Sequence, residues 1–252
     1  MRDGTARAGV QILTPEWPAP ANVRAAFTLR HHGVSKGPYD SLNVGARVGD
    51  EPAAIAENRR RLRAQLQLPQ EPAWIDQVHG TEVLDLDSTA PPAAADAAFT
   101  RRAGRVCVVQ VADCLPVLIT ARDGSVVAAA HAGWRGLAAG VLEATVRRLA
   151  VEPGQAMVWL GPAIGQAHFE VGDEVRQVFL ARDAAAAAAF AANARGRWQC
   201  DLARLARGRL AALGVSAVFG GGWCTHADAS RFFSFRRDGR CGRMAALIWR
   251  QV

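Results

Sequence analysis

The apolar positions of the chain fall into short runs separated by turn residues, a pattern that predicts many short strands. The longest run, residues 105–120 (RVCVVQVADCLPVLIT), is rich in β-branched residues and is typical of a buried strand. Within residues 121–134, Asp123-Gly124 is a strong signal for a two-residue hairpin turn. Further strands are expected at residues 25–30, 73–80, 81–86, 96–101, 156–165 and 215–225, with a strand pair around Asp238-Gly239 in residues 232–250.

Other segments follow the helical period. Residues 53–68 place Ile55, Leu62 and Leu66 on one side of a helix, and residues 201–214 read as a helix that begins at Asp201 and stops at Gly214. Helices are also expected over residues 137–151 and over most of residues 170–192, which include a run of six alanines. Residues 31–52 are rich in Gly, Pro, Asp and Asn and predict a long loop of the kind that tends to be functional.

The order of these elements predicts one domain of the α+β or the mixed α/β class. Strands and helices alternate without strict βα regularity, and the chain has no internal repeat, flexible linker or break in composition. A length of 252 residues is sufficient for a substantial core. We expect the domain to span residues 25–252, after a proline-rich lead-in over residues 1–24.

Composition narrows the class of protein. Apolar residues make up 50% and charged residues 21%, which excludes disorder as the main state, and no apolar run approaches the length of a membrane span. The N-terminal residues lack the apolar region of a secretory signal, so we expect a cytoplasmic protein without a membrane partner. The net charge of +7 comes from scattered arginines, so nucleic acid is not the expected partner. Five widely spaced cysteines without a CxxC motif predict no disulfide framework.

The hairpin at residues 105–134 brings two reactive side chains together. With a two-residue turn at Asp123-Gly124, Pro116 pairs with His131, and Cys114 lies diagonal to His131 on the same face. A three-residue loop would reverse the parity and place the thiol and the imidazole on opposite faces. At this register the two side chains could share a metal ion or a proton, whereas the alternative is a buried thiol beside a hydrogen-bonded core histidine.

His79 supplies a third ligand of the same character. It lies in Gln77-Val78-His79-Gly80-Thr81, at the expected end of a strand. A thiolate and two imidazoles form a borderline-soft set suited to zinc, and three protein ligands with an open fourth position are the catalytic arrangement. Dispersed spacing of this kind is much less specific than a CxxC pair.

Several motifs together resemble the laccase-domain family, once called multicopper polyphenol oxidases. They are FTLRHHGVSKGPYDSLNVG, QVHGTEV, ADCLPVL, HAGWRG, GPAIG, FEVGDEV and FFSFRRDG…GRMAALIW, and they run from about Phe27 to Trp249. Members of this family are described as multifunctional purine nucleoside phosphorylases, and some as peptidoglycan editing factors. One departure is His32, at a position where the family pattern leads us to expect glycine.

The resemblance implies a fold, a metal site and an activity. The fold would be mixed β-sheets packed together and flanked by helices, in α/β/β/α layers. The metal triad of the family falls on His79, Cys114 and His131. It implies zinc, with copper as the alternative, and the phosphorolysis of inosine, guanosine, adenosine and methylthioadenosine together with deamination of adenosine. The small-molecule partners would be a purine nucleoside and phosphate. The sequence does not give the oligomeric state, and we favour a monomer.

The residues themselves argue against two related chemistries. A multicopper oxidase needs many histidines, several of them as His-x-His, and this chain has six histidines and no such motif. The H-x-E…P-C-x-x-C signature of the zinc deaminases acting on cytidine is also absent.

Phosphorolysis additionally requires groups that hold an anion. The candidates are a C-terminal set and one residue after the HAGW motif: Ser234, Arg236, Arg237, Arg243 and Arg135. A solvated arginine face is the alternative interpretation of this set. Asn43 and Gln77 could contact hydroxyl groups or base edges, or could simply form turns. Asp113 could orient a ligand or transfer a proton, although its neighbour Cys114 should face the opposite side of the strand.

Two other functions remain open at this point. Cys114 could be the nucleophile of a hydrolase with His131 as its base, acting on an amide or on a cell-wall peptide precursor. The positive charge could also serve a nucleotide- or RNA-binding module. His168 and His226 are interpreted as surface or loop histidines, and Cys224 as a loop residue near the site with no assigned role.

Overall fold

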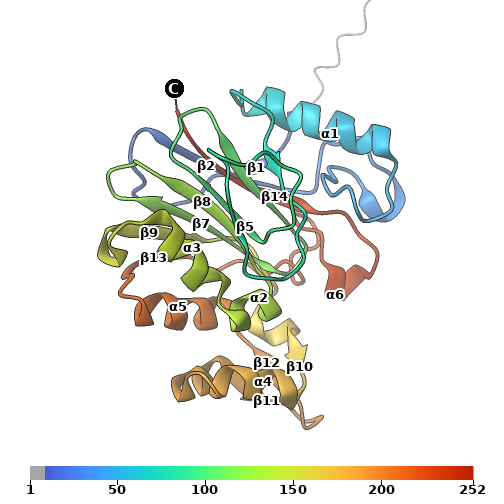
Figure 1. The fold of residues 1–252 in the computed structure, drawn as a ribbon. Helices are drawn as coiled ribbons and strands as arrows, with labels where there is room; N and C mark the ends of the chain where they lie inside the picture. Colours follow the sequence, from blue (N-terminus) through green and yellow to red (C-terminus); the bar gives the residue numbers. More distant parts are fainter. Residues whose placement is uncertain (1–8, 252) are drawn as a thin grey trace, which may run out of the picture.

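Two mixed β-sheets stack face to face, and helices cover both outer faces (Figure 1). The computed structural model describes residues 9–251; residues 1–8 of the expected lead-in and residue 252 lie outside the described part. A single α+β domain with mixed sheets and helices is therefore confirmed. The described part of the lead-in holds strand β1 and the first residues of β2.

One sheet has five strands in the order β1-β2-β14-β6-β3. All neighbours are antiparallel except β3 and β6. The strands are β1 (Ile12–Leu13), β2 (Val23–Thr28), β14 (Met244–Arg250), β6 (Val106–Val111) and β3 (Ala73–Trp74). The C-terminal strand thus lies at the centre of the sheet, between segments from the first half of the chain.

The other main sheet has six strands in the order β13-β9-β7-β8-β5-β4. Its two outer pairs are parallel and its inner pairs antiparallel. The strands are β13 (Ala217–Gly220), β9 (Ala156–Leu160), β7 (Leu115–Ala121), β8 (Val127–Ala132), β5 (Ala97–Thr100) and β4 (Val83–Asp85).

The central core lies between the two sheets. Alternate residues of each strand point into it, since successive side chains on a strand face opposite sides. Leu118 and Ala129 from the six-stranded sheet meet Val109 and Ile248 from the five-stranded sheet, and all four are fully buried. The same parity directs Pro116, His131 and Cys114 toward the inter-sheet side of the six-stranded sheet.

Two further apolar cores lie between the sheets and the helices that cover them. Helix α1 packs on the five-stranded sheet, where Leu62 joins Val108 and Leu247. Helices α2, α3 and α5 pack on the outer face of the six-stranded sheet (Figure 1). The helices are α1 (Pro52–Gln65), α2 (Trp134–Ala139), α3 (Val141–Leu149), α4 (Asp173–Leu180), α5 (Leu202–Ala212) and α6 (Phe235–Asp238). Among the described residues, no helix combines the length and the apolar character that crossing a membrane requires.

A small third sheet extends beyond the layered body (Figure 1). Its strands are β10 (Glu170–Val171), β12 (Trp198–Cys200) and β11 (Phe190–Ala192), in that order. Helix α4 accompanies it, and Phe179 of that helix packs against Phe190 with ring centroids 6.0 Å apart.

The hairpin register expected from Asp123-Gly124 is confirmed. In the ladder between β7 and β8, Pro116 pairs with His131. Gly124 takes a left-handed φ of 68°, which glycine adopts at no steric cost.

The interpretation of residues 105–120 as one strand is wrong, because the run forms two strands in different sheets. β6 belongs to the five-stranded sheet and β7 to the six-stranded sheet. The chain passes from one to the other through Asp113, whose φ is 85°. Both halves are buried, so the apolar pattern alone cannot distinguish one long strand from two. A left-handed aspartate provides the turn.

Two expected helices are shorter than predicted. Residues 137–151 are divided between α2 and α3 at Gly140, whose φ of 107° ends the first helix. Residues 170–192 form β10 and α4, then a 3₁₀ helix over the alanine run (Ala184–Ala189), then β11. The helix propensity of alanine is a weak preference, and tertiary contacts override it here because the chain continues directly into β11 of the third sheet.

The predicted strand pair at residues 232–250 is also corrected. The segment forms the short helix α6 followed by the single strand β14. Ser234 caps the helix by accepting a hydrogen bond from the Arg237 backbone N–H, and Gly239 ends it with a φ of 66°.

The inter-sheet core provides a stability test. Leu118→Ala should lower the free energy of unfolding by about 2–5 kcal/mol, because it removes a fully buried side chain and leaves a cavity. Val178→Ala, at a side chain that is 46% exposed, should change it by less than about 0.5 kcal/mol. Urea unfolding measures both, and equal effects would contradict this description of the core.

Candidate metal centre and its cavity

Three potential metal ligands converge at one end of the inter-sheet core. Cys114 directly precedes β7, His131 lies in β8, and His79 lies in the loop between β3 and β4. Their ligand atoms all lie within 4.8 Å of one another. The sulfur of Cys114 is 3.8 Å from Nε2 of His79, and the two imidazole rings meet edge to face with centroids 4.8 Å apart.

Asp96 holds two of these ligands in place. Its fully buried carboxylate lies 2.8 Å from Nδ1 of His131 and accepts backbone N–H bonds from Val78, His79 and Gly80 at 2.6–3.1 Å. Sequence reasoning missed Asp96. The only available signal was a lone acidic residue in an otherwise small and apolar segment.

The local backbone is shaped to bring the ligands close. His79 has a φ of 61°, an uncommon conformation that the three bonds to Asp96 stabilise. Gly133 follows His131 closely in the chain, and a Cβ there would lie 3.0 Å from both the Cys114 sulfur and Cδ2 of His79. Only glycine leaves this contact unstrained.

The Cys114 thiol and the His131 imidazole shift each other's pKa. Burial raises the pKa of Cys114, but the neighbouring His131 and His79 outweigh it and lower that pKa to about 6. Burial lowers the pKa of His131, but Cys114 and Asp96 together raise it to about 9. The arrangement therefore favours a thiolate beside a positive charge, which a metal cation can also supply.

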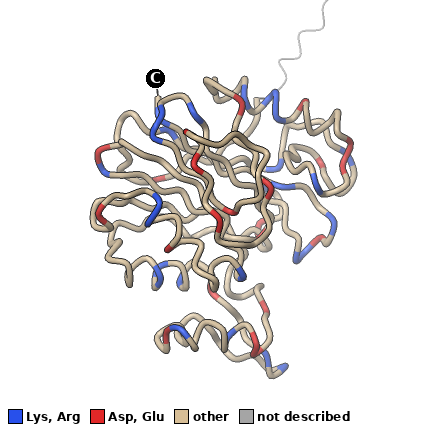
Figure 2. The backbone as a smooth tube through the Cα atoms, in the orientation of Figure 1, with Lys and Arg blue, Asp and Glu red and all other residues tan. Residues whose placement is uncertain are grey.

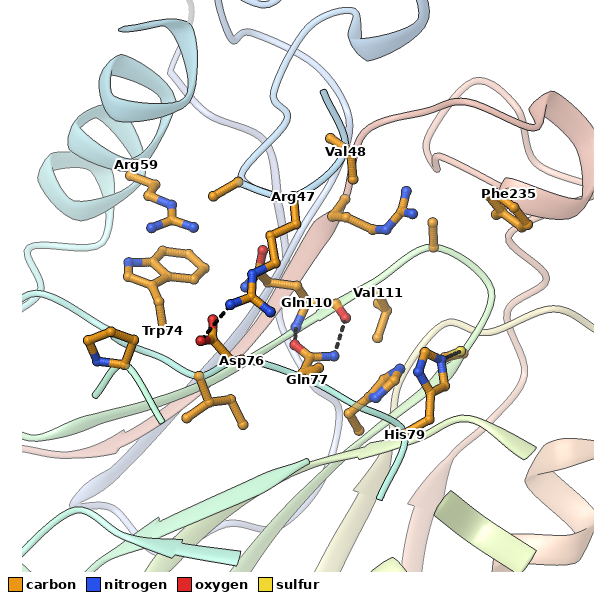
Figure 3. Close-up of a pocket in the computed structure, with 18 residues that line it drawn as sticks. Arg47, Val48, Arg59, Trp74, Asp76, Gln77, His79, Gln110, Val111 and Phe235 are labelled. Atoms are coloured by element: carbon orange, nitrogen blue, oxygen red, sulfur yellow. Dashed lines mark hydrogen bonds and ion pairs between the residues drawn. The ribbon is translucent and has the colours of Figure 1, made fainter. Parts of the chain in front are cut away.

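A cavity of about 620 Å³ opens at the three ligands (Figure 3). Aromatic rings of Trp74 and Phe235 line it, and the side chain of Phe235 is 57% exposed at its surface. Three guanidinium groups also line it, from Arg47, Arg59 and Arg243. Arg47 is paired with Asp76 at 2.6 Å, and Arg59 lies over the Trp74 ring at 3.9 Å.

Arg243 stands apart from the other candidate anion-binding residues because it lines this cavity. Its backbone N–H donates to the side chain of Asn43, and its Nη1 donates to the carbonyls of Cys241 and Gly242. Within residues 9–251, every hydrogen bond described for this guanidinium goes through Nη1. Its Nε and Nη2 groups are thus the donors with capacity for an anion.

The structure does not bring the other arginine candidates to the cavity. Arg236 donates to the carbonyl of Glu170, and Arg237 donates to the carbonyls of Thr225, His226 and Phe232. Arg135 is exposed and lies over the ring of its neighbour Trp134. Arginine and lysine side chains are spread over many parts of the molecule (Figure 2).

Asp113 and Ser234 form a buried hydrogen-bonded cluster separate from the cavity lining. The Asp113 carboxylate accepts bonds from the hydroxyls of Thr225 and Ser234 at 2.5 and 3.0 Å, and from the Arg236 backbone N–H at 2.6 Å. The Asp113 side chain is therefore bonded away from the ligand triad. Its hydrogen bonds connect the C-terminal segment to the turn between β6 and β7, beside Cys114.

The side chains of Gln77 and Asn43 make hydrogen bonds within the protein. The Gln77 side-chain amide exchanges two hydrogen bonds with the Gln110 backbone, at 2.8 and 2.7 Å, while also lining the cavity (Figure 3). Asn43 is fully buried and bonds to Gly45 and Asp50.

His32, the departure from the family pattern, has a φ of 67°. Glycine adopts this left-handed conformation at no steric cost, which explains why glycine was expected there.

Comparison with known proteins identifies the family. Residues 24–251 match the family model described as multi-copper polyphenol oxidoreductase laccase. The chain belongs to this laccase family. A relative from Pseudomonas aeruginosa, named purine nucleoside phosphorylase, is 55% identical over 240 residues, which cover 95% of this chain and 98% of the relative. Purine nucleoside phosphorylase YfiH of Escherichia coli is 52% identical over 242 residues, with 95% and 98% covered.

Solved structures agree with the laccase-family fold. A crystal structure of a Neisseria meningitidis protein has a TM-score of 0.92 at 46% identity and covers 96% of this chain and 99% of its own. YlmD from Geobacillus stearothermophilus has a TM-score of 0.86 at 33% identity, with 92% and 93% covered.

The donor set of this laccase-family chain fits a zinc ion. Zinc binds thiolate and imidazole at about 2.3 and 2.1 Å in a tetrahedron, which places ligand atoms about 3.5 Å apart. The observed 3.8 Å between Cys114 and His79 is close to that value. Asp96 on Nδ1 of His131 leaves Nε2 for the ion, and this carboxylate–histidine contact is the usual support of a zinc ligand.

Asp96→Asn tests the support of the centre. The amide nitrogen of asparagine cannot accept the loop N–H bonds, so the free energy of unfolding should fall by about 3–5 kcal/mol. In metal-free protein the pKa of His131 should also fall below about 9, because the carboxylate that favours the imidazolium is lost. Urea unfolding and NMR titration of the histidines measure the two effects, and an unchanged His131 titration would contradict the assigned contact.

Proposed function

We propose that this protein is a zinc-dependent purine nucleoside phosphorylase that acts on inosine, guanosine, adenosine and methylthioadenosine and also deaminates adenosine. The names of the Pseudomonas and Escherichia relatives support the reaction class. The observation that carries the proposal is a His-Cys-His donor set at one end of a cavity of about 620 Å³. Cavities of about 300–1,000 Å³ are typical of small-molecule sites.

The cavity lining matches the parts of a nucleoside and a phosphate ion. Trp74 and Phe235 offer aromatic faces for a purine base, and Arg243 offers two guanidinium donors for phosphate. In phosphorolysis, a phosphate oxygen forms a bond to C1′ of the sugar while the bond from C1′ to the purine nitrogen breaks. Arg243 lines the cavity with positive charge, which supports binding of the anion there.

His79, Cys114 and His131 would hold the zinc ion beside the cavity that they line. When bound, the ion supplies a Lewis acid that activates water or polarises the substrate. The deaminase activity requires water to attack C6 of adenine as ammonia leaves. Cys114 and the two imidazoles act here as ligands, whereas the arginines bind and orient the anion.

Removing a ligand should remove both metal and activity. Cys114→Ala and His131→Ala should lose stoichiometric zinc and lower inosine phosphorolysis at least a hundredfold, because two ligands hold zinc poorly. His32→Gly, in a loop residue that is not part of the triad, should keep both. Metal analysis by mass spectrometry, which also distinguishes copper from zinc, and a phosphate-dependent hypoxanthine assay measure the outcome. Full phosphorolysis in a metal-free variant would remove zinc from the proposal.

Arg243 and Arg236 form a matched pair for the anion site. Arg243→Ala should raise KM for phosphate tenfold or more, since a hydrogen bond to a charged group contributes about 1.5–3 kcal/mol. Arg236→Ala should leave that KM nearly unchanged, because its guanidinium donates to the Glu170 carbonyl outside the cavity. Equal effects of the two substitutions on KM would overturn the assignment of Arg243.

A Cys-His hydrolase is the second candidate, favoured by one observation. The pKa of Cys114 lowered to about 6 beside His131 is also a property of a cysteine nucleophile that attacks an amide or a cell-wall peptide precursor. Iodoacetamide distinguishes the two functions. Under the zinc proposal, Cys114 should be alkylated only after a chelator removes the metal. Rapid alkylation of the active, metal-containing enzyme would favour the hydrolase.

A further inference from the structure

Cys224 and two histidines form a second cluster outside the metal centre. The Cys224 sulfur lies 3.5 Å from Nδ1 of His168, and the imidazole of His226 stacks on that of His168 with centroids 4.4 Å apart. None of the three is among the residues that line the larger cavity. No pattern in the sequence assigns a role to any of the three.

The Cys224 sulfur is surrounded by hydrogen-bond donors. The backbone N–H groups of Gly165 and Ala227 donate to it at 3.2 and 3.4 Å. A Cβ at Gly165 would lie 3.1 Å from the sulfur, so glycine permits this approach. Donors directed at a sulfur stabilise negative charge on it, and the nearby imidazole can receive the thiol proton.

A separate cavity of about 130 Å³ opens at Cys224. Its lining is rich in glycine, with Gly161, Gly221 and Gly222 among the residues. A volume of this size holds only a few water-sized molecules, since water in the liquid occupies about 30 Å³. A small oxidant fits, whereas a disulfide with a substituent on each sulfur is much larger.

The other cysteines lack this combination. Cys107, Cys200 and Cys241 are buried, and burial raises the pKa of each thiol. Cys114 belongs to the metal triad. Cys224 is partly exposed, has a histidine partner and faces a cavity.

We propose that Cys224 is a peroxide-oxidisable thiol, with His168 as the proton carrier and hydrogen peroxide as the co-reactant. His168 takes the thiol proton, and the sulfur attacks one peroxide oxygen. An S–O bond forms as the O–O bond breaks, so the sulfur loses two electrons to become a sulfenic acid and the peroxide is reduced. The second oxygen leaves as hydroxide, takes the proton from His168 and becomes water.

The test is sulfenic-acid trapping in the full-length, zinc-loaded protein. Hydrogen peroxide is added with dimedone, and peptide mass spectrometry locates and times the label. We expect the label on Cys224 and its loss in Cys224→Ser. His168→Asn should slow labelling at least tenfold, because the amide is of similar size but cannot carry the proton. His226→Asn is the matched control, since His226 stacks on His168 without a described bond to the sulfur, and should change the rate less than about threefold.

Two results would overturn the proposal. One is absence of the label from Cys224 under conditions that label free glutathione. The other is an unchanged labelling rate in His168→Asn. His168→Gln serves as a second variant with the same expectation, and thermal melting verifies that each variant is folded. His168 is only partly buried, so these substitutions should be tolerated.

Discussion

One buried carboxylate organises the candidate metal centre. Asp96 has no exposed surface, and a charge in such a position is stable only with several close partners. It has four of them: three consecutive backbone N–H groups of the His79 loop and Nδ1 of His131. The loop and strand β8 are therefore attached to the same two oxygens, which brings ligands 52 positions apart in the chain to one point. The three potential metal ligands are therefore held together by hydrogen bonds of the protein itself.

A second buried carboxylate, that of Asp113, also connects distant segments of the chain beside Cys114. Asp113 turns the chain from the five-stranded to the six-stranded sheet, and its oxygens bind Thr225, Ser234 and the Arg236 backbone. Thr225 follows Cys224 directly, so this contact also positions the second thiol cluster. The two aspartates thus position the chain around Cys114 through different partners, one through β8 and one through the C-terminal segment.

The sequence predicted local relations well and distant ones poorly. The Asp123-Gly124 turn sets the pairing of Pro116 with His131, because hairpin register depends on a few adjacent residues. Ligand chemistry and then the family motifs pointed to His79, which periodicity could not connect to the hairpin. The partners of Asp113 are more than 100 positions away, and no pattern near Asp113 indicates them. The splitting of residues 105–120 between two sheets was missed for a similar reason, since burial on both sides looks the same in either arrangement.

The arginine-rich composition shows why charge alone does not single out the proposed anion site at Arg243. Lys36 is the one lysine among 30 basic residues, so nearly all the positive charge is carried by guanidinium groups with several donors each. Many of these donors bind carbonyl oxygens of the protein, as Arg237 does with three of them. A guanidinium used in this way stabilises a loop and has few donors left for a ligand. Arg243 differs because its described bonds use one nitrogen while the cavity lies beside it. An arginine can bind an anion only with guanidinium N–H groups that do not already donate to the protein. Those groups can be identified only when the carbonyl partners of each arginine are known from the structure.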